Sequence, residues 1–297
     1  MNSTGATAVS AASARRVRVD ADDTPPKENS AVPELTRRII AAAVMLPIAV
    51  AAVWFGSWIF AVLVIVVTGI AYVEWQMITM GHRDFSAIAL GLAAAMLAGV
   101  AMMLALPLGA LLVMLLAALA AWLLQRDLYA PGGIVYALAP LIALIALRMD
   151  ANSGLAAVFF VLTVVWATDT GAYFAGRLIG GPKLWPRVSP KKTWAGLIGG
   201  MICAAAVGLA AARLTGEAPA AVLALLGAAL AVVAQAGDFL ESALKRRFGV
   251  KDSGAIIPGH GGVMDRVDGI VTASCAAALL GAAHGGAANV GSGLMMW

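Results

Sequence analysis

Long apolar segments alternate with short polar ones through most of the chain. Nine windows are predicted to form apolar helices: 39–56, 58–80, 87–106, 108–124, 133–148, 154–176, 196–212, 218–237 and 267–289. A helix needs roughly 20 apolar residues to cross about 30 Å of hydrocarbon, so most windows are close to the length of a membrane span. The pattern therefore predicts an all-α, polytopic integral membrane protein with about nine transmembrane helices. Only the short break "LPLGA" separates the third window from the fourth.

The composition agrees with a membrane protein. Hydrophobic residues make up 62% of the chain and charged residues only 12%, which excludes an ordinary soluble domain. Residues 1–36 differ, because they are rich in Ser, Ala, Thr and Pro and have too few large apolar side chains to pack a core. We therefore expect a disordered cytoplasmic tail over 1–36 and a membrane-embedded domain over 37–297. The arginines of the tail are followed by acids and prolines, which a signal peptide would not show.

Basic residues are distributed unevenly over the segments between the windows. With the tail inside and nine spans, 18 Lys and Arg residues fall on the cytoplasmic side and only Arg148 and Arg213 on the other. The positive-inside rule expects such an asymmetry. We therefore place the polar segments 176–196 and 237–269 in the cytoplasm, at what we expect to be a bacterial inner membrane.

Two acidic residues, Asp169 and Glu74, lie inside apolar windows and away from the window ends. An ionisable side chain at the middle of a membrane helix costs roughly 2.5 to 3.5 kcal/mol on insertion, so its usual reason is functional. Asp169, in "VVWATDTGAYFAGR", is the clearer case, although it could instead pair with a base such as Arg177. Glu74, in "AYVEWQM", lies beside Trp75 and could either have a function or simply reach the lipid headgroups.

The first polar segment, "GRLIGGPKLWPRVSPKKTWAG", combines Gly and Pro with basic side chains, among them Lys191 and Lys192. Glycine lets backbone N–H groups approach a phosphate, and lysine supplies a compact positive charge. The segment could therefore hold the phosphates of a substrate. It could equally be a basic loop that contacts anionic lipid.

In the second polar segment, "GDFLESALKRRFGVKDSGAIIPGHGGVMDRVDG", acids flank a basic, glycine-rich stretch. If the preceding helix continues past Gly237, three polar residues share one of its faces: Asp238, Ser242 and Lys245. Asp265 and Asp268, three residues apart, share a face at the start of the last apolar window. Mg²⁺ takes one or two protein carboxylates and completes its shell with phosphate oxygens and water. The acids therefore favour a site for Mg²⁺ bound to a polyphosphate.

Basic residues and glycines lie between these acids. The positive charges that could neutralise phosphate are those of Lys245, Arg246, Lys251 and Arg266. His260, followed by Gly261 and Gly262, could contact phosphate, act in catalysis or order the turn. The alternative is a solvated loop with helix-capping acids, the usual explanation of a run of charges. That alternative gives no reason for the glycines and a proline to gather beside the acids.

The stretch "SALKRRFGVKDSGAIIPGHGGVMDRVD" resembles the signature of the phosphatidate cytidylyltransferases, also called CDP-diacylglycerol synthases. The residues at the fixed positions of that pattern are Ser242, Lys245, Arg246, Lys251, Asp252, Pro258, His260, Gly261, Gly262, Asp265, Arg266 and Asp268. The upstream stretches "DTGAYFAGRLIG" and "SPKKTW" are similar to further motifs of the family in order and spacing. The similarity covers roughly residues 35–290.

The resemblance implies a bundle of membrane helices, often a homodimer, that uses Mg²⁺ to join CTP to phosphatidic acid and gives CDP-diacylglycerol and pyrophosphate. Asp238 and Asp265 match the acids expected to hold the metal. The expected catalytic residues, all within an active region at 165–269, are Asp238, Lys245, Arg246, Lys251, Asp252, His260, Asp265, Arg266 and Asp268. The expected substrate contacts are Asp169, Lys191, Lys192, Ser242, Gly261 and Gly262. Membrane lipids are expected partners, and nucleic acid is not.

The chemistry of this reaction suits the residues. The nucleophile would be the lipid phosphate, which is already anionic at neutral pH, so no Ser/His/Asp or Cys/His arrangement is needed and none is visible. Displacement at the α-phosphorus of CTP requires charge neutralisation and in-line positioning, which acids holding Mg²⁺ and basic side chains supply. One departure from the family pattern is Ala195, because an acidic residue usually follows "SPKKTW". A role for a carboxylate at that position is therefore open.

Other functions fit the sequence less well. A CDP-alcohol phosphotransferase would show a D-G-x-x-A-R stretch, whereas Asp268 and Gly269 are followed by "IVTAS". A prenol kinase shares part of the architecture but is not expected to show the whole run of family motifs. A transporter or channel with Asp169 and Glu74 on an ion path would have acids spread across the membrane depth, whereas most of the acids cluster at one face.

Overall fold

The computed structural model describes residues 34–82, 84–254 and 261–297, with side chains from residue 43 onwards. The predicted tail lies outside this part of the chain, apart from its last three residues, 34–36, which belong to the first helix. The elements in chain order are α1 (Glu34–Phe55), α2 (Ser57–Met80), α3 (Phe85–Met103), α4 (Pro107–Gln125), α5 (Tyr129–Met149), α6 (Gly154–Leu178), β1 (Lys183–Trp185), β2 (Ser189–Thr193), α7 (Trp194–Thr215), α8 (Ala220–Arg247), α9 (Met264–Gly285) and α10 (Val290–Met295).

Eight helices in the described part of the chain, α2 to α9, are long and apolar enough to cross a membrane. The helix α1 contributes a shorter apolar stretch, Ala43–Phe55, within that part. Helices suit hydrocarbon because they satisfy their own backbone N–H and C=O groups where no water is present. The predicted all-α membrane fold is therefore confirmed, with nine spans as an approximate count. The protein is an integral membrane protein.

The breaks between the helices follow local backbone chemistry. Gly56, between α1 and α2, has a φ of 63°, a conformation that glycine adopts without steric cost. Ala105 has a φ of 56° shortly before Pro107 opens α4. Proline suits the first turn of a helix, where its missing N–H would have no helical partner. The break between α3 and α4 falls at residues 104–106, so the predicted "LPLGA" stretch begins at the break and continues into α4.

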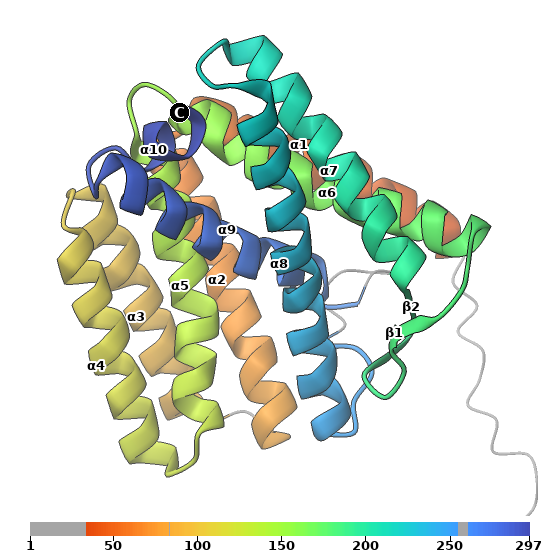
Figure 1. The fold of residues 1–297 in the computed structure, drawn as a ribbon. Coiled ribbons are helices and arrows are strands. Elements are labelled where there is room, and N and C mark those ends of the chain that lie inside the picture. The colour runs from red at the N-terminus through yellow and green to blue at the C-terminus, as the bar shows by residue number, and fades with distance from the viewer. Residues whose placement is uncertain (1–33, 83, 255–260) are drawn as a thin grey trace, which may run out of the picture. The chain divides into compact units, whose positions relative to one another are not determined.

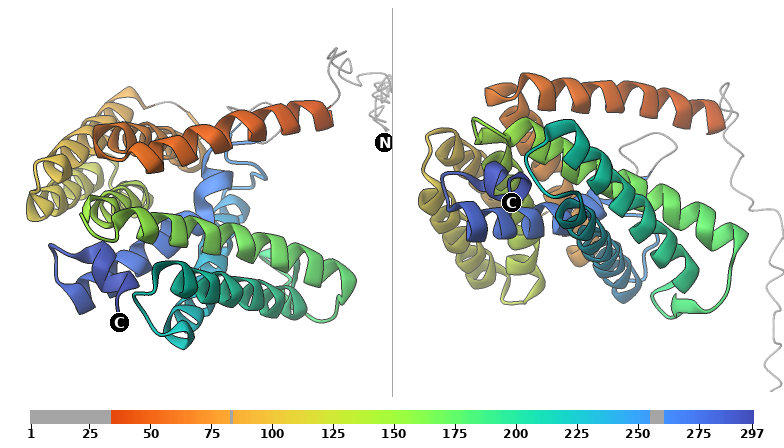
Figure 2. Two further views of the ribbon diagram at one scale, coloured as in Figure 1. Left: turned by 90° about the horizontal axis from the view of Figure 1, so that it is seen from above. Right: turned by 45° about the horizontal axis from the view of Figure 1, so that its top comes forward.

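Small residues allow close packing of α3, α4 and α5. Figure 1 shows α3 and α4 side by side, next to α5 and α2. The buried positions of α3 and α4 include several alanines: Ala94, Ala98, Ala110, Ala117 and Ala121. In a membrane, helices associate through packing rather than exclusion of water, so small side chains that let backbones approach are favoured. The helix α1 lies along the outside of α2 and α6 (Figure 2).

Glycines bring α6 against α7. A Cβ added to Gly196 would lie 2.9 Å from the carbonyl oxygen of Ala172, and one added to Gly200 would lie 2.9 Å from the carbonyl oxygen of Thr168. The backbones therefore cross too closely for larger side chains at these positions. This crossing sets the C-terminal half of α6, which carries Asp169, beside the start of α7 and the strand β2 that precedes it.

Two features around the polar segments go beyond the predicted helices. The strands β1 and β2 form an antiparallel hairpin with Lys183 opposite Thr193, where the sequence indicated only a loop. The helix α8 continues to Arg247, well past the predicted end of its span at residue 237. The continuation confirms the condition under which Asp238 and Lys245 share a helix face.

Candidate active site

A polar cavity of about 480 Å³ lies among α6, α7, α8 and the strand β2. Its acidic residues are Asp169 of α6 and Asp238 of α8, and its basic residues are Arg177, Lys191 and Lys192. Cavities of this volume are typical of sites for small molecules. Four residues that the sequence assigned to the site, from three separate elements, therefore line one cavity.

An ion pair joins the hairpin to α8 inside this cavity. Lys192 Nζ lies 2.5 Å from Asp238 Oδ2, with 18% and 30% of the two side chains exposed. The ammonium group also lies 4.7 Å from the centre of the Phe239 ring, a favourable cation–π arrangement. Among the described residues Nζ has no partner with hydrogen-bond geometry. The contact with Asp238 is therefore an ion pair without a directed hydrogen bond.

Asp169 belongs to this group rather than to a pair with Arg177. Its charge interacts with those of Asp238 and Lys192. Arg177 instead donates from Nη1 to the hydroxyl of Tyr173 at 3.0 Å. Both Asp169 and Arg177 lie in the described part of the chain, and no ion pair forms between them. The pairing considered as an alternative from the sequence is thus not observed.

A close crossing of α8 and α9 adds a third carboxylate. A Cβ on Gly237 would lie 2.5 Å from the carbonyl oxygen of Asp268, so only glycine fits there. The charge of Asp268 interacts with those of Asp238, Asp169 and Lys192. Within this group of four side chains, three formal negative charges meet one positive charge. The group thus has an excess of two negative charges.

A second charged cluster lies further along α8. Lys245 Nζ donates to Asp265 Oδ1 at 2.6 Å and to Glu241 Oε2 at 3.0 Å. Ser242 Oγ donates to Asp238 Oδ1 at 3.3 Å, which joins this turn of α8 to the cavity. The predicted face of Asp238, Ser242 and Lys245 therefore exists, and its lysine bridges two helices.

Asp265 also orders the segment before α9. Its Oδ2 accepts hydrogen bonds from the backbone N–H groups of Ser253 and Gly262, each at 3.0 Å. Gly261 has a φ of 83°, which strains any residue with a side chain. Asp265 thus holds both ends of the polar segment that precedes its own helix.

Glu74 of α2 is buried, with 2% of the residue exposed. Its carboxylate accepts hydrogen bonds from the backbone N–H groups of Val263 at 3.0 Å and Met264 at 2.7 Å, and from Ser253 Oγ at 3.2 Å. The first N–H groups of a helix lack intrahelical partners and carry partial positive charge. Glu74 therefore caps α9 from a neighbouring helix and does not reach the lipid headgroups.

The remaining predicted residues divide into two sets. The first set lies at exposed positions and comprises Arg246, Lys251, Asp252 and Arg266. His260 lies outside the described residues. Catalytic roles for these five residues stay predictions.

Several residues of the site were not singled out from the sequence. Thr193 and Gln235 line the polar cavity, and Glu241 pairs with Lys245. Tyr136 of α5 lies within range of the charges of Glu241 and the site aspartates. The spacing of four between Glu241 and Lys245 could have revealed that pair, because such residues are neighbours on a helix. No local signal indicated Tyr136, since only folding brings α5 to the acids.

The sequence profile of the Cytidylyltransferase family matches residues 36–283, a span that holds the cavity, the charged clusters and the capping glutamate. The chain belongs to the cytidylyltransferase family. It is therefore a nucleotidyltransferase, as the motifs predicted.

Similar curated proteins agree with the family assignment. A protein of Brucella suis biovar 1 (strain 1330), named phosphatidate cytidylyltransferase, is 39% identical over 254 residues, which cover 84% of this chain and 93% of that protein. A protein of Brucella melitensis with the same name shows the same identity and coverage. A Staphylococcus saprophyticus protein of that name is 48% identical over 118 residues, 39% of this chain and 45% of that protein.

The carboxylates of this cytidylyltransferase have the chemistry that a hard divalent cation prefers, and within the described residues no three acidic, histidine or cysteine side chains gather into one cluster that could hold a metal ion. Carboxylate oxygens are the protein ligands that Mg²⁺ prefers, and it commonly uses one or two of them. Asp238 is open to the cavity, and its negative charge adds to those of Asp169 and Asp268. With Lys191 and Arg177, which line the same cavity, the three negative and three positive formal charges cancel, so the fit rests on the oxygen donors and not on net charge. Asp265 differs, because its two oxygens already accept three hydrogen bonds.

Proposed function

We propose that this cytidylyltransferase joins CTP to phosphatidic acid and releases pyrophosphate, giving CDP-diacylglycerol. The observation that carries the proposal is the ion pair of Lys192 and Asp238 in a cavity that also contains Asp169, Lys191 and Arg177. Positive charges suited to a triphosphate and carboxylates suited to its metal thus line the same space. The name of the relatives supports phosphatidic acid as the lipid substrate.

The proposed reaction is a displacement at phosphorus. An oxygen of the lipid phosphate forms a bond to the α-phosphorus of CTP, and the bond from that phosphorus to the oxygen bridging to the β-phosphate breaks. The electron pair of the broken bond leaves with pyrophosphate. The attacking phosphate is already anionic, so the step requires no general base.

In this mechanism the protein mainly positions the phosphates and neutralises their charge. Lys192 exchanges Asp238 for a phosphate oxygen of CTP, and Lys191 and Arg177 contribute further positive charge from the cavity wall. Asp238 and Asp265 are the predicted metal residues, and the charge of Asp268 interacts with that of Asp238. Mg²⁺, when bound, would supply positive charge at the phosphates that amino-acid side chains alone do not.

We further propose that the site faces the cytoplasm at a bacterial inner membrane and that the enzyme is a homodimer. CTP is water-soluble and the lipid stays in the bilayer, so the reaction requires the membrane interface. The 18 basic residues on the side of the N-terminal tail support the cytoplasmic orientation. Chemical cross-linking in native membranes tests the dimer, and labelling of single introduced cysteines tests the orientation.

The direct test is the transfer of radiolabelled CTP into a chloroform-soluble product by the full chain in detergent, with phosphatidic acid and with or without Mg²⁺. We expect Mg²⁺-dependent label in lipid. Lys192→Ala should lower kcat/KM by about 10²- to 10³-fold, the usual effect of losing one preorganised donor at a transition state. The matched control is Lys183→Ala, because Lys183 is exposed on the same hairpin and does not line the cavity. Equal activity of Lys192→Ala and Lys183→Ala would show that Lys192 does not take part in the reaction.

A further inference from the structure

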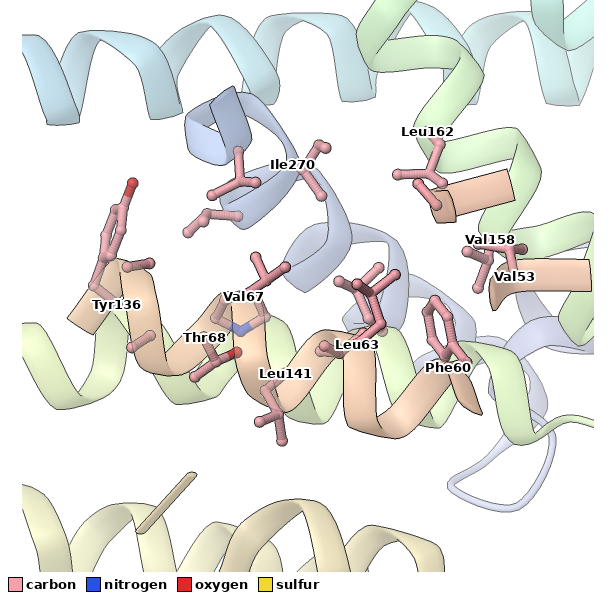
Figure 3. A pocket seen from close by; sticks show the side chains of 18 residues that line it. Val53, Phe60, Leu63, Val67, Thr68, Tyr136, Leu141, Val158, Leu162 and Ile270 are labelled. Atoms are coloured by element: carbon pink, nitrogen blue, oxygen red, sulfur yellow. The ribbon is translucent and has the colours of Figure 1, made fainter. Parts of the chain in front are cut away.

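A second, apolar cavity lies among α1, α2, α5, α6 and α9. Its volume is about 130 Å³, and the side chains that line it are apolar except for Thr68 and Tyr136 (Figure 3). Apolar cavities of roughly 150 Å³ stay dry and can bind one molecule of the size of benzene. The cavity therefore suits a short stretch of hydrocarbon and suits neither water nor a charged headgroup.

The cavity is elongated along α2. Figure 3 shows Tyr136 at one end and Phe60 and Val53 at the other, with Val67 and Leu63 of α2 between them. At a rise of about 1.5 Å per residue, the wall from Ala71 to Phe60 extends for roughly 16 Å. A cavity so long and of so small a volume is narrow, and it holds only about as many carbon atoms as benzene has, which suits the first few carbons of one hydrocarbon chain.

One end of the cavity adjoins the charged residues of the active site. Val267 lines the cavity, and its neighbours in sequence on α9 are Arg266 and Asp268. At the same end is Tyr136, which is 6% exposed and whose hydroxyl has no hydrogen-bond partner among the described residues. A free hydroxyl donor thus stands where an apolar space meets carboxylates. An ester group, with oxygen acceptors beside a hydrocarbon chain, has the chemistry to fit this junction.

We propose that the cavity binds the proximal part of one acyl chain of the lipid substrate, with the Tyr136 hydroxyl donating to the ester at its head. This inference rests on the proposed function, because it assumes a diacyl lipid whose phosphate reacts at the charged cluster. A lipid chain gains little from leaving one apolar environment for another, so packing and steric fit determine its binding. The cavity therefore limits which acyl chains are accepted.

Two consecutive valines of α2 provide a matched pair for the test. Val67 lines the cavity, whereas Val66 is 51% exposed on the outer face of the helix. Val67→Phe places a ring inside the cavity, in the path of the acyl chain. Val66→Phe adds the same ring outside the cavity. Both variants are assayed as the full chain in detergent micelles, with a series of phosphatidic acids whose acyl chains lengthen from four to eighteen carbons.

The expected result is a break in the dependence on chain length. Val67→Phe should match the wild type on the shortest chains and lose about tenfold in kcat/KM on the longest, because overpacking a filled space is destabilising. Val64→Phe, three residues or about 4.5 Å deeper, should show its break at longer chains. Val66→Phe should follow the wild type throughout.

The possible results distinguish a failure of the acyl-chain proposal from a failure of the proposed function. The first outcome concerns the ratio of kcat/KM for Val67→Phe to kcat/KM for the wild type. If this ratio stays constant over all chain lengths, the acyl site is overturned, even if the ratio lies below one. If Val67→Phe is inactive on every substrate, the same ratio of kcat/KM is measured for Val67→Leu, which adds one methylene. A ratio that falls with chain length supports the acyl site, and a constant ratio overturns it. If the wild type itself labels no phosphatidic acid of any length, the proposed function fails instead.

Discussion

Glu74 Oε2 on α2 lies 2.7 Å from the backbone nitrogen of Met264, the first residue of α9. The contact crosses between two membrane helices, and no side chain at the N-cap residue Val263 replaces it. A Cβ on Gly262 would lie 2.6 Å from the same oxygen, so the glycine is what lets the backbone reach the carboxylate. The start of the helix that carries Asp265 and Asp268 is therefore fixed by a buried acid from a different part of the chain.

Two replacements of Glu74, by glutamine and by alanine, should destabilise the protein to different degrees. Glu74→Gln keeps one carbonyl acceptor but loses the charge, while Glu74→Ala leaves the N–H groups of Val263 and Met264 unpaired. Each unpaired buried group costs about 1–3 kcal/mol, so alanine should lower the thermal midpoint clearly more than glutamine does. Thermal unfolding in detergent measures both. Equal midpoints for the two variants would contradict the capping role.

Asp265→Asn should weaken the use of Mg²⁺ while the protein stays folded. Asparagine keeps the size of the side chain but removes the charge that faces Lys245. Residues that hold or orient metal ligands typically contribute about 10- to 100-fold in metal affinity or activity, so the Mg²⁺ concentration for half-maximal turnover should rise by at least about tenfold. The control is Asp84→Asn, which changes the cap of α3 away from the site. An unchanged Mg²⁺ dependence would exclude Asp265 from the metal site.

The helices could be predicted from the sequence because bilayer thickness leaves so few alternatives. Each of the windows corresponds to an observed helix, and even the "LPLGA" break falls where Pro107 begins α4. The set of site residues was also predictable in part. The face of Asp238, Ser242 and Lys245 depends only on helical spacing, which local sequence determines.

The contacts that join distant segments could not be predicted in this way. The strands β1 and β2 are three and five residues long, too short for a pattern of alternation. The cap by Glu74 and the position of Tyr136 depend on which helices pack together. A single sequence does not show which helices pack together. The interpretation of Glu74 therefore stayed divided between a functional role and contact with the lipid headgroups.

Asp150, just after α5, links the α5–α6 turn to α10. Its Oδ1 accepts hydrogen bonds from the N–H groups of Asn152 and Ser153 and from Ser292 Oγ, and its Oδ2 accepts one from the N–H of Ser292. Burial alone would raise the pKa of the carboxyl group. The hydrogen bonds outweigh it and lower the pKa below the ordinary value of 3.8.

The lowered pKa of Asp150 predicts a pH-dependent contribution to stability. Because the folded pKa lies below the unfolded one, the contribution is fully present above about pH 4 and is lost as the pH falls through the folded pKa. Asp150→Asn should therefore lower the unfolding midpoint most at neutral pH, through the loss of charged hydrogen bonds. The difference from the wild type should shrink below about pH 4. A difference that grows in acid would contradict this.

Ala195→Glu should change stability more than activity. Residue 195 is the second residue of α7 and does not line the polar cavity. A carboxylate in the first turn of a helix stabilises it by roughly 0.3–1 kcal/mol, so the thermal midpoint should rise slightly. Ala195→Gln, without the charge, is the control, and kcat/KM of both should stay within about twofold of the wild type, since residue 195 does not line the cavity. A tenfold gain with glutamate alone would show that a carboxylate at 195 takes part in the reaction.

Tyr136→Phe should reduce affinity for the lipid without loss of stability. The buried hydroxyl has no partner among the described residues, so its removal abolishes a desolvation penalty and should leave the unfolding midpoint unchanged or higher. In the complex the same hydroxyl donates to the substrate ester, and a hydrogen bond of about 0.5–1.5 kcal/mol corresponds to a rise of roughly two- to tenfold in the KM for phosphatidic acid. The KM for CTP should not change. Tyr129→Phe is the control, because the Tyr129 hydroxyl on the same helix accepts a hydrogen bond from Arg247 and does not line the apolar cavity. A lower midpoint for Tyr136→Phe, with both KM values unchanged, would assign the hydroxyl a structural role instead.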